Sequence, residues 1–202
     1  MSNRTLEQRE TAYNKVKSFI FDSEYMQNDE QKSNALRSLF NYLETETPWL
    51  TAFCSTAYHN SYEGGLLDHS INVANTALRL ARVLAPDLNE VEIVITALLH
   101  DCGKCDMYKR KPATERQKQY GYPGSMGVDT DTPYMEHEDK SLWIITKFYP
   151  YLTEEMFCAI AQHNEPWLTS TSQFRHNKLM TLIQNADYWC CMYVDEPGSA
   201  SK

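Results

Sequence analysis

The stretch that decides the fold is VEIVITALLHDCGK, residues 91–104. Up to Leu99 it is apolar on nearly every side, a pattern typical of a helix buried at the centre of a domain. Asn89, just before it, is a good helix cap. The run then ends on a polar pair, His100-Asp101. Imidazoles and carboxylates are costly to bury unless they are paired or bind a metal, so this end of the helix is the first candidate for a functional site.

Apolar residues at helical spacing extend to both sides of this central segment. The helix expected at 47–58 rests on Thr47-Pro48, which combines a capping residue with proline at the first helical position. The pattern predicts an all-α fold, a single helical bundle. Besides the central segment, the expected helices are 5–21, 28–44, 47–58, 66–84, 138–149, 153–163 and 177–194.

A chain of 202 residues predicts one domain. The helices of residues 1–55 are expected to pack on a core formed by 56–195, and residues 196–202 to form a flexible tail. Residues 107–134 interrupt the helical pattern with prolines and glycines, which predicts a long irregular, lid-like insertion. A short hairpin within 119–134 is an option.

The charge balance limits the partners. The chain has 19 basic and 27 acidic side chains, a formal net charge of −8. This argues against binding duplex DNA, but a local positive site for a small anion remains compatible with it. No apolar stretch approaches the roughly 20 residues that span a bilayer, and the first residues have no apolar signal core. We therefore expect no membrane partner, a cytoplasmic location and six reduced cysteines.

Six polar side chains lie where helical packing would otherwise favour apolar ones, and together they suggest a metal site. Imidazole nitrogens and carboxylate oxygens suit Mn²⁺, Fe²⁺, Co²⁺, Ni²⁺ or Zn²⁺, with Mg²⁺ also open. Four of them are enough for one ion, and two more histidines with a bridging carboxylate are enough for a second. Such a centre keeps a net positive charge, attracts a phosphate and lowers the pKa of its water. The six are His69, His100, Asp101, His137, His163 and Asp187.

The order of these six residues resembles the HD superfamily of metal-dependent phosphohydrolases in its six-ligand, two-metal form. The segments HNSYEGGLLDHS (59–70) and LLHDCGK (98–104) are most similar to the HD domains of bacterial oligonucleotide-degrading exoribonucleases. The resemblance covers about residues 55–195. The OB-fold that precedes the HD domain in those enzymes is not apparent here, which speaks against long RNA as a substrate.

By position, the resemblance implies that His69, His100, Asp101 and Asp187 hold one metal. Asp101 would bridge to a second ion held by His137 and His163. A one-metal centre without His137 and His163 stays open. Lys104 matches the family lysine that contacts a substrate oxyanion, so Asp101 and Lys104 are the expected catalytic residues.

Further residues are candidates for substrate binding. His59 precedes the glycine pair Gly64-Gly65 and is a candidate for donating a proton to a leaving oxygen. The basic run KRKPATERQK (109–118) is either a solvated loop or a lid that meets phosphates. Glu138 is a candidate for orienting a ligand. Cys102 and Cys105 have zinc-knuckle spacing without a second pair, so packing is the preferred interpretation. The substrate-binding candidates are Lys104, His59, Lys109, Arg110 and Arg116.

The leading hypothesis is a phosphohydrolase that cleaves a phosphate mono- or diester of a small, nucleotide-like substrate with a metal-activated hydroxide. One alternative is a mixed-valent di-iron oxygenase of the same superfamily, acting on a polyol or phosphonate. Another is a non-catalytic module that binds a nucleotide. The oligomeric state stays open, with a homodimer as one option.

Overall fold

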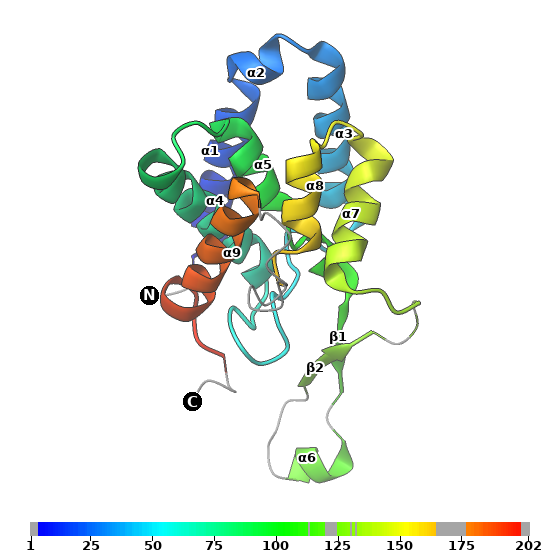
Figure 1. The fold of residues 1–202 in the computed structure, drawn as a ribbon. Coiled ribbons are helices and arrows are strands. Elements are labelled where there is room, and N and C mark those ends of the chain that lie inside the picture. Colours follow the sequence, from blue (N-terminus) through cyan, green and yellow to red (C-terminus); the bar gives the residue numbers. More distant parts are fainter. Residues whose placement is uncertain are drawn as a thin grey trace.

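The computed structural model describes residues 4–112, 114–119, 125–129, 131, 133–164 and 177–198. The described part is mainly helical with one small sheet (Figure 1), so the all-α prediction is confirmed. The helices are α1 (Leu6–Phe21), α2 (Glu24–Gln27), α3 (Glu30–Glu46), α4 (Gly65–Leu84), α5 (Glu90–Leu99), α6 (Glu115–Gln119), α7 (His137–Phe148), α8 (Glu154–Ala161) and α9 (Lys178–Trp189). The remaining elements are a 3₁₀ helix η1 (Cys102–Asp106), a π-helical turn η2 (Cys190–Val194), and strands β1 (Tyr108–Lys111) and β2 (Ser125–Val128).

Helix α5 is the centre of the bundle, as its sequence predicts. The Asn89 side chain caps it by accepting hydrogen bonds from the backbone of Val91 and Glu92. All residues from Ile93 to Leu99 are buried. The helix packs on α4, α8 and α9 (Figure 1), and its last residues point the chain toward the polar pair His100-Asp101.

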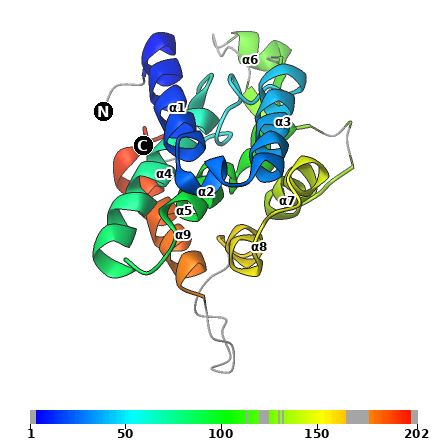
Figure 2. The ribbon, with the colours of Figure 1, turned by 90° about the horizontal axis from the view of Figure 1, so that it is seen from above.

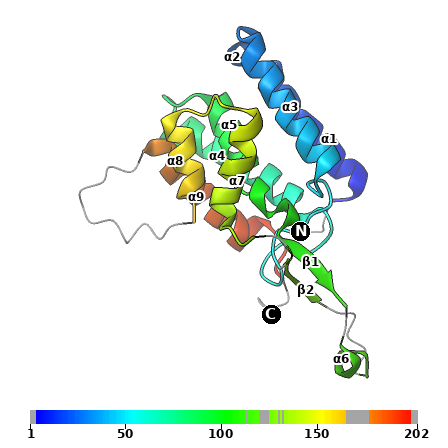
Figure 3. The same cartoon turned by 90° about the vertical axis from the view of Figure 1, so that its right-hand side faces the viewer.

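Helices α1 and α3 lie on one side of the bundle and are joined by α2 (Figures 2 and 3). Phe40 of α3 makes edge-to-face contacts with Tyr13 and Phe21 of α1, at centroid distances of 6.1 and 5.8 Å. Tyr13 and Ile20 belong to the same apolar cluster as the residues of α4 and α5. The N-terminal helices and the central helices therefore share one core.

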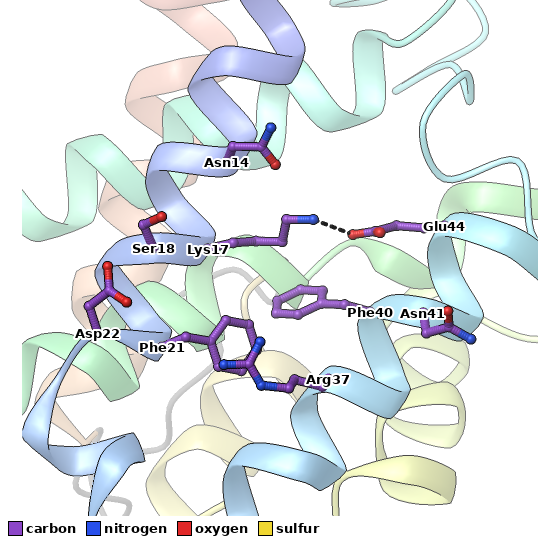
Figure 4. Close-up of a pocket in the computed structure, with 9 residues that line it drawn as sticks. All are labelled: Asn14, Lys17, Ser18, Phe21, Asp22, Arg37, Phe40, Asn41 and Glu44. Atoms are coloured by element: carbon purple, nitrogen blue, oxygen red, sulfur yellow. Dashed lines mark hydrogen bonds and ion pairs between the residues drawn. The ribbon is translucent and has the colours of Figure 1, made fainter.

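Part of the surface between α1 and α3 is hollowed into a pocket of about 550 Å³ (Figure 4). Its wall carries an ion pair of 2.8 Å between Lys17 and Glu44, and the Arg37 guanidinium stacks on Phe21. The charges of Lys17 and Glu44 therefore compensate each other inside the pocket. None of the six residues predicted to bind metal lines it.

The prediction of a helix over 47–58 is wrong. Helix α3 runs on to Glu46 and ends at Thr47, whose hydroxyl donates to the Leu43 carbonyl at 2.6 Å. Thr47 has an extended backbone, as expected before a proline. The Pro48 carbonyl then accepts from the backbone of Thr51 and Ala52, which makes a single turn. The cap-plus-proline signal thus marks the end of one helix and a turn rather than the start of a new helix.

The insertion at 107–134 is more regular than expected. Strands β1 and β2 pair antiparallel, with Tyr108 opposite Val128 and Lys111 opposite Ser125. The hairpin therefore begins earlier than the range 119–134 suggested for it. It projects from the helical body and carries α6 at its far end (Figures 1 and 3).

Residues 196–198, the first part of the tail expected at 196–202, pair with the loop before α4. The backbone N–H of Asn60 donates to the Glu196 carbonyl at 2.9 Å, and the Asn60 side chain accepts from the Glu196 N–H at 2.8 Å. Pro197 forms a β-bridge with His59. Residues 199–202 lie outside the described residues. Among the described helices, none is long and apolar enough to cross a membrane.

Because α1 shares the core, Ile20→Ala should destabilise the whole domain. Ile20 is fully buried, and removing such a side chain costs about 2–5 kcal/mol of unfolding free energy. Urea unfolding followed by circular dichroism and by tryptophan fluorescence should show one shifted transition. Leu6→Ala, at an exposed position of the same helix, is the matched control and should change the free energy by about 0.5 kcal/mol or less. Two separate transitions, of which only one shifts, would contradict the shared core.

Candidate metal centre

The structure brings all six residues predicted to bind metal into one cluster, although they come from five segments of the chain. His69 lies near the start of α4, and His100 and Asp101 follow α5. His137 is the first residue of α7, His163 follows α8, and Asp187 lies in the last turn of α9.

Asp101 is the middle of the cluster, and its two oxygens face different histidines. Oδ2 lies 3.5 Å from Nε2 of His69 and 3.4 Å from Nε2 of His100. Oδ1 lies 3.4 Å from Nε2 of both His137 and His163. One carboxylate thus separates two pairs of imidazoles.

Asp187 joins only the first of these pairs. Its Oδ1 lies 3.1 Å from Nε2 of His69 and 3.8 Å from Nε2 of His100. Donor atoms that share one ion at about 2.0–2.2 Å are typically about 3–3.5 Å apart, so the spacing of this group suits a common ion. The three donor atoms of His69, His100 and Asp187 all lie within 4.8 Å of one another.

The Nδ1 atoms of the four histidines all lie near acceptor oxygens, which favours a hydrogen on Nδ1 in each ring. His100 Nδ1 donates to the Ala97 carbonyl at 2.7 Å, and His163 Nδ1 donates to the Ile160 carbonyl at 2.8 Å. The other two face carboxylates: His69 Nδ1 lies 2.7 Å from Asp195 Oδ2, and His137 Nδ1 lies 3.1 Å from Glu138 Oε2. A neutral imidazole with its hydrogen on Nδ1 would turn the Nε2 lone pair toward Asp101, the arrangement that metal-binding histidines adopt.

Two further observations show that this pocket fits divalent cations. The Nε2 atoms of His69 and His100 are 3.4 Å apart, so their lone pairs repel unless a cation or proton lies between them. Asp101 Oδ1 is buried and accepts no hydrogen bond from the described part of the chain. The donor set of nitrogen and oxygen suits borderline divalent metals.

The protonation states of two ligands suit metal binding directly, whereas the pKa values of His69 and His163 are raised despite their burial, so a bound ion would replace a proton on each. Burial alone would raise the pKa of Asp101, but Lys104 and His100 hold it well below its usual range, so the carboxylate is ionised. Burial lowers the pKa of His137 to about 3, so this imidazole is neutral at physiological pH. Ionised carboxylate and neutral imidazole are the forms that bind a metal.

Gly103 explains how the sequence brings the second pair of histidines to Asp101. A Cβ atom at this position would lie 2.5 Å from the His137 carbonyl oxygen and 2.5 Å from the Ser141 backbone nitrogen. The Gly103 N–H also donates to the Ser141 hydroxyl at 2.8 Å. Because residue 103 has no side chain, α7 can pack directly on η1 and carry His137 to the cluster.

The glycine pair plays a similar part at the start of α4. A Cβ atom on Gly65 would lie 2.0 Å from the Asn60 carbonyl oxygen. Gly64 has a positive φ of 80°, which favours glycine. The glycine pair therefore places the beginning of α4, and with it His69, against the preceding loop.

Lys104 lies at the edge of the cluster, with Nζ 2.6 Å from Asp101 Oδ2. Burial alone would lower the pKa of Lys104, but Asp101 raises it above its usual range, so the ammonium stays charged. The side chains of Lys104 and His137 are each 14% exposed and that of Asp187 is 17% exposed, whereas His69 and His100 have no exposed area. Solvent therefore reaches the centre on the side of Lys104, His137 and Asp187.

The other predicted substrate-binding residues are placed differently. His59 contacts other groups: its Nδ1 is 3.1 Å from Asp195 Oδ2, and its Nε2 is within 3.8 Å of two thiols. Lys109 pairs with Asp129 and Asp131 of its own hairpin, each at 2.8 Å. Arg116 is exposed on α6, away from the helical body (Figure 1). The side chain of Arg110 lies outside the described part.

Sequence reasoning missed Asp195, whose side chain has no exposed area and contacts both His59 and His69. It follows the π-helical turn, so helical spacing does not place it on any face. Glu138, by contrast, does lie beside His137, where its position in the sequence suggested a ligand-orienting role.

The surroundings of the Cys102 and Cys105 thiols support a packing role rather than a metal or redox site. Both are buried, and the Cys102 sulfur lies 3.9 Å from the Ser141 carbonyl oxygen. Burial raises the pKa of the Cys105 thiol to about 12, which keeps it protonated. In the described part of the chain, neither thiol belongs to a group of donor atoms close enough to share an ion.

Comparison with known proteins agrees with this site. The family model for the HD domain matches residues 66–189, more than half of the chain, and the chain belongs to this family. It is thus a member of the HD superfamily of metal-dependent phosphohydrolases.

One curated relative is the dihydroneopterin 2′,3′-cyclic phosphate phosphodiesterase of Methanocaldococcus jannaschii, 43% identical over 61 residues. The match covers 28% of this chain and about a quarter, 24%, of that relative's length. No solved structure matches the chain significantly.

The shared carboxylate gives a direct prediction for metal content. Asp101→Ala should lose both ions, because Asp101 contributes an oxygen to each pair of histidines. His137→Ala should lower the content from about two ions to about one, because the group of His69, His100 and Asp187 remains. Metal analysis of protein reconstituted with Mn²⁺ or Co²⁺ measures this. Asp87→Ala, an exposed carboxylate in the loop after α4, is the control and should keep the wild-type content. Equal metal content in His137→Ala and wild type would exclude the second ion site.

Proposed function

We propose that this chain is a two-metal phosphohydrolase that cleaves a phosphate ester of a small, nucleotide-like substrate. The observation that carries the proposal is the position of Asp101, whose two oxygens face two separate pairs of histidine Nε2 atoms. A bridging carboxylate in this position would hold two cations near one another, the arrangement used for in-line displacement at phosphorus. Family membership supports the same chemistry.

The chain's own residues have distinct parts in this reaction. Bound divalent ions would supply Lewis acidity and a nucleophilic hydroxide at neutral pH. Asp101 would hold the two ions at a fixed separation, with His69, His100 and Asp187 on one side of it and His137 and His163 on the other. Lys104, on the solvent-accessible side, would bind a phosphoryl oxygen and offset the negative charge that develops there.

The geometry of Lys104 supports this part. Its Nζ atom contacts the same Asp101 oxygen that faces the first pair of histidines. An anion that binds at this edge therefore meets an ammonium and the metal pocket together. In a chain of net charge −8, such a local concentration of positive charge is what would attract a small phosphate ester.

A cyclic phosphodiester is the first substrate class to test, because the curated relative is named as a phosphodiesterase for a 2′,3′-cyclic phosphate. The assay uses protein loaded with Mn²⁺, Co²⁺ or Zn²⁺ against 2′,3′- and 3′,5′-cyclic nucleotides, dinucleotides and phosphomonoesters. Release of the ring-opened phosphate or of inorganic phosphate without oxygen supports hydrolysis. Strictly O₂-dependent turnover of a polyol or phosphonate, with two irons bound, would favour the oxygenase instead. Binding without any turnover would favour the nucleotide-binding module.

The proposed role of Lys104 predicts a loss in turnover without a loss of metal. Lys104→Gln should lower kcat by about 10²-fold or more, the scale seen when one group that stabilises transition-state charge is removed. Its metal content should stay near two ions, because the lysine is no ligand. Lys178→Gln is the control, since Lys178 pairs with Asp87 and lies at the end of α9 that is far from Asp187. An unchanged kcat in Lys104→Gln would remove the lysine from the mechanism.

A further inference from the structure

We propose that Asp195 is the positioning residue for the metal ligand His69, and that the pairing of residues 196–198 with residues 58–60 keeps Asp195 beside His69. This inference rests on the proposed metal centre but needs neither the phosphohydrolase activity nor its substrate. No motif of the HD domain match includes Asp195, because the match ends at residue 189.

The contacts of Asp195 are those of a carboxylate that orients an imidazole. Its Oδ2 accepts from His69 Nδ1 at 2.7 Å, and its Oδ1 accepts from the Asn72 side-chain amide at 2.8 Å. The side chain has no exposed area. A carboxylate that accepts the Nδ1 hydrogen fixes the tautomer and the ring plane, and makes Nε2 a stronger ligand.

Asn72 fixes the carboxylate in turn. Its side-chain oxygen accepts from Arg4 at 2.6 Å, which leaves its NH₂ group to face Asp195. Arg4 and Arg9 both pair with Asp68, next to His69 in the first turns of α4. The orientation of His69 thus depends on groups from the N-terminal segment, α4 and the C-terminal segment together.

Backbone pairing seats the C-terminal segment. Residues 196–198 bond to residues 58–60: Glu196 exchanges hydrogen bonds with Asn60, Pro197 bridges to His59, and the Gly198 N–H donates to the Tyr58 carbonyl. A Cβ atom on Gly198 would lie 2.1 Å from the Ala57 carbonyl oxygen, so the segment packs closely on this loop. Because the loop leads directly into α4, the pairing places Asp195 beside His69.

The same stretch of chain holds His69 from both ring nitrogens. Asp187, in α9, lies on the Nε2 side, and Asp195 lies on the Nδ1 side. Between them the helix widens into the π-helical turn η2, a feature that is frequent at functional sites. The Asp195 N–H donates to the Cys190 carbonyl at 2.9 Å, and the chain then becomes extended.

His69 differs in this respect from the other three histidines. The Nδ1 atoms of His100 and His163 donate to carbonyls three residues earlier, and His137 faces the adjacent Glu138. These partners belong to the same helix end as the histidine, so they are in place as soon as that helix has formed. The partner of His69 is 126 residues away in sequence, so loss of Asp195 should weaken one metal position and leave the other intact.

The test measures metal affinity in two backgrounds, each keeping one of the two ion positions. In the His137→Ala background, Asp195→Ala should weaken Mn²⁺ or Co²⁺ binding by about 10–100-fold in calorimetric titration, the usual effect of removing such a partner. In the His69→Ala background it should have no effect. Asp195→Asn keeps an oxygen that can accept from Nδ1 and should lose less affinity. Asp87→Asn is the charge-matched control in both backgrounds.

A second readout covers the case in which Asp195→Ala folds poorly. Long-range ¹H–¹⁵N spectra of the metal-free full chain should show a hydrogen on Nδ1 of His69. The spectra of the Asp195→Asn variant should show the same. Equal affinities of Asp195→Ala and its parent in the His137→Ala background would overturn the inference, as would a wild-type His69 that carries a hydrogen on Nε2 and none on Nδ1. Absence of metal binding in the wild type would instead overturn the proposed centre, so the two failures are distinguishable.

Discussion

The structure depends on one buried carboxylate. Asp101 is almost completely removed from water, and removing an ion from water carries a penalty of several kcal/mol unless opposite charge surrounds it. The Lys104 ammonium meets one of its oxygens, while the other accepts no hydrogen bond from the described residues. The fold therefore contains an incomplete electrostatic arrangement that divalent cations would complete. Because such ions would bind only the folded chain, they would also stabilise it.

The helices can be understood from this requirement. Five segments end or begin at the cluster, and two of its histidines, His100 and His163, follow the C-terminal ends of helices, where backbone carbonyls are available. His100 and His163 use the same local solution, an Nδ1 hydrogen bond to a carbonyl three residues back. The geometry of these two ligands is therefore part of the helix ends themselves. His69 lies inside α4, where carbonyls are committed to the helix, and it needs a carboxylate from elsewhere in the chain.

This difference explains how much the sequence could predict. Helix α5 and its polar end follow from local periodicity, and all six residues of the cluster carry a local signal, a polar side chain at an apolar position. The prediction of a helix over 47–58 failed because Thr47-Pro48 is equally compatible with the end of a helix. The hydrogen bond from the Thr47 hydroxyl to the Leu43 carbonyl shows that a helix ends here. Asp195 could not be found because its role depends on pairing between residues 58–60 and 196–198, which no local pattern indicates.

The charged residues of the insertion also show that a local sequence pattern does not reveal a side chain's partners. A basic run suggests phosphate binding as long as its partners are unknown, yet Lys109 is paired with two aspartates of its own hairpin. The cation that does reach the centre is Lys104, which stands in η1 directly before the hairpin. Strand β1 begins at Tyr108, only four residues later, so the hairpin starts beside the open side of the centre formed by Lys104, His137 and Asp187. The part of the insertion that can influence substrate access is therefore its base next to η1, because α6 at the far end lies away from the helical body (Figure 1).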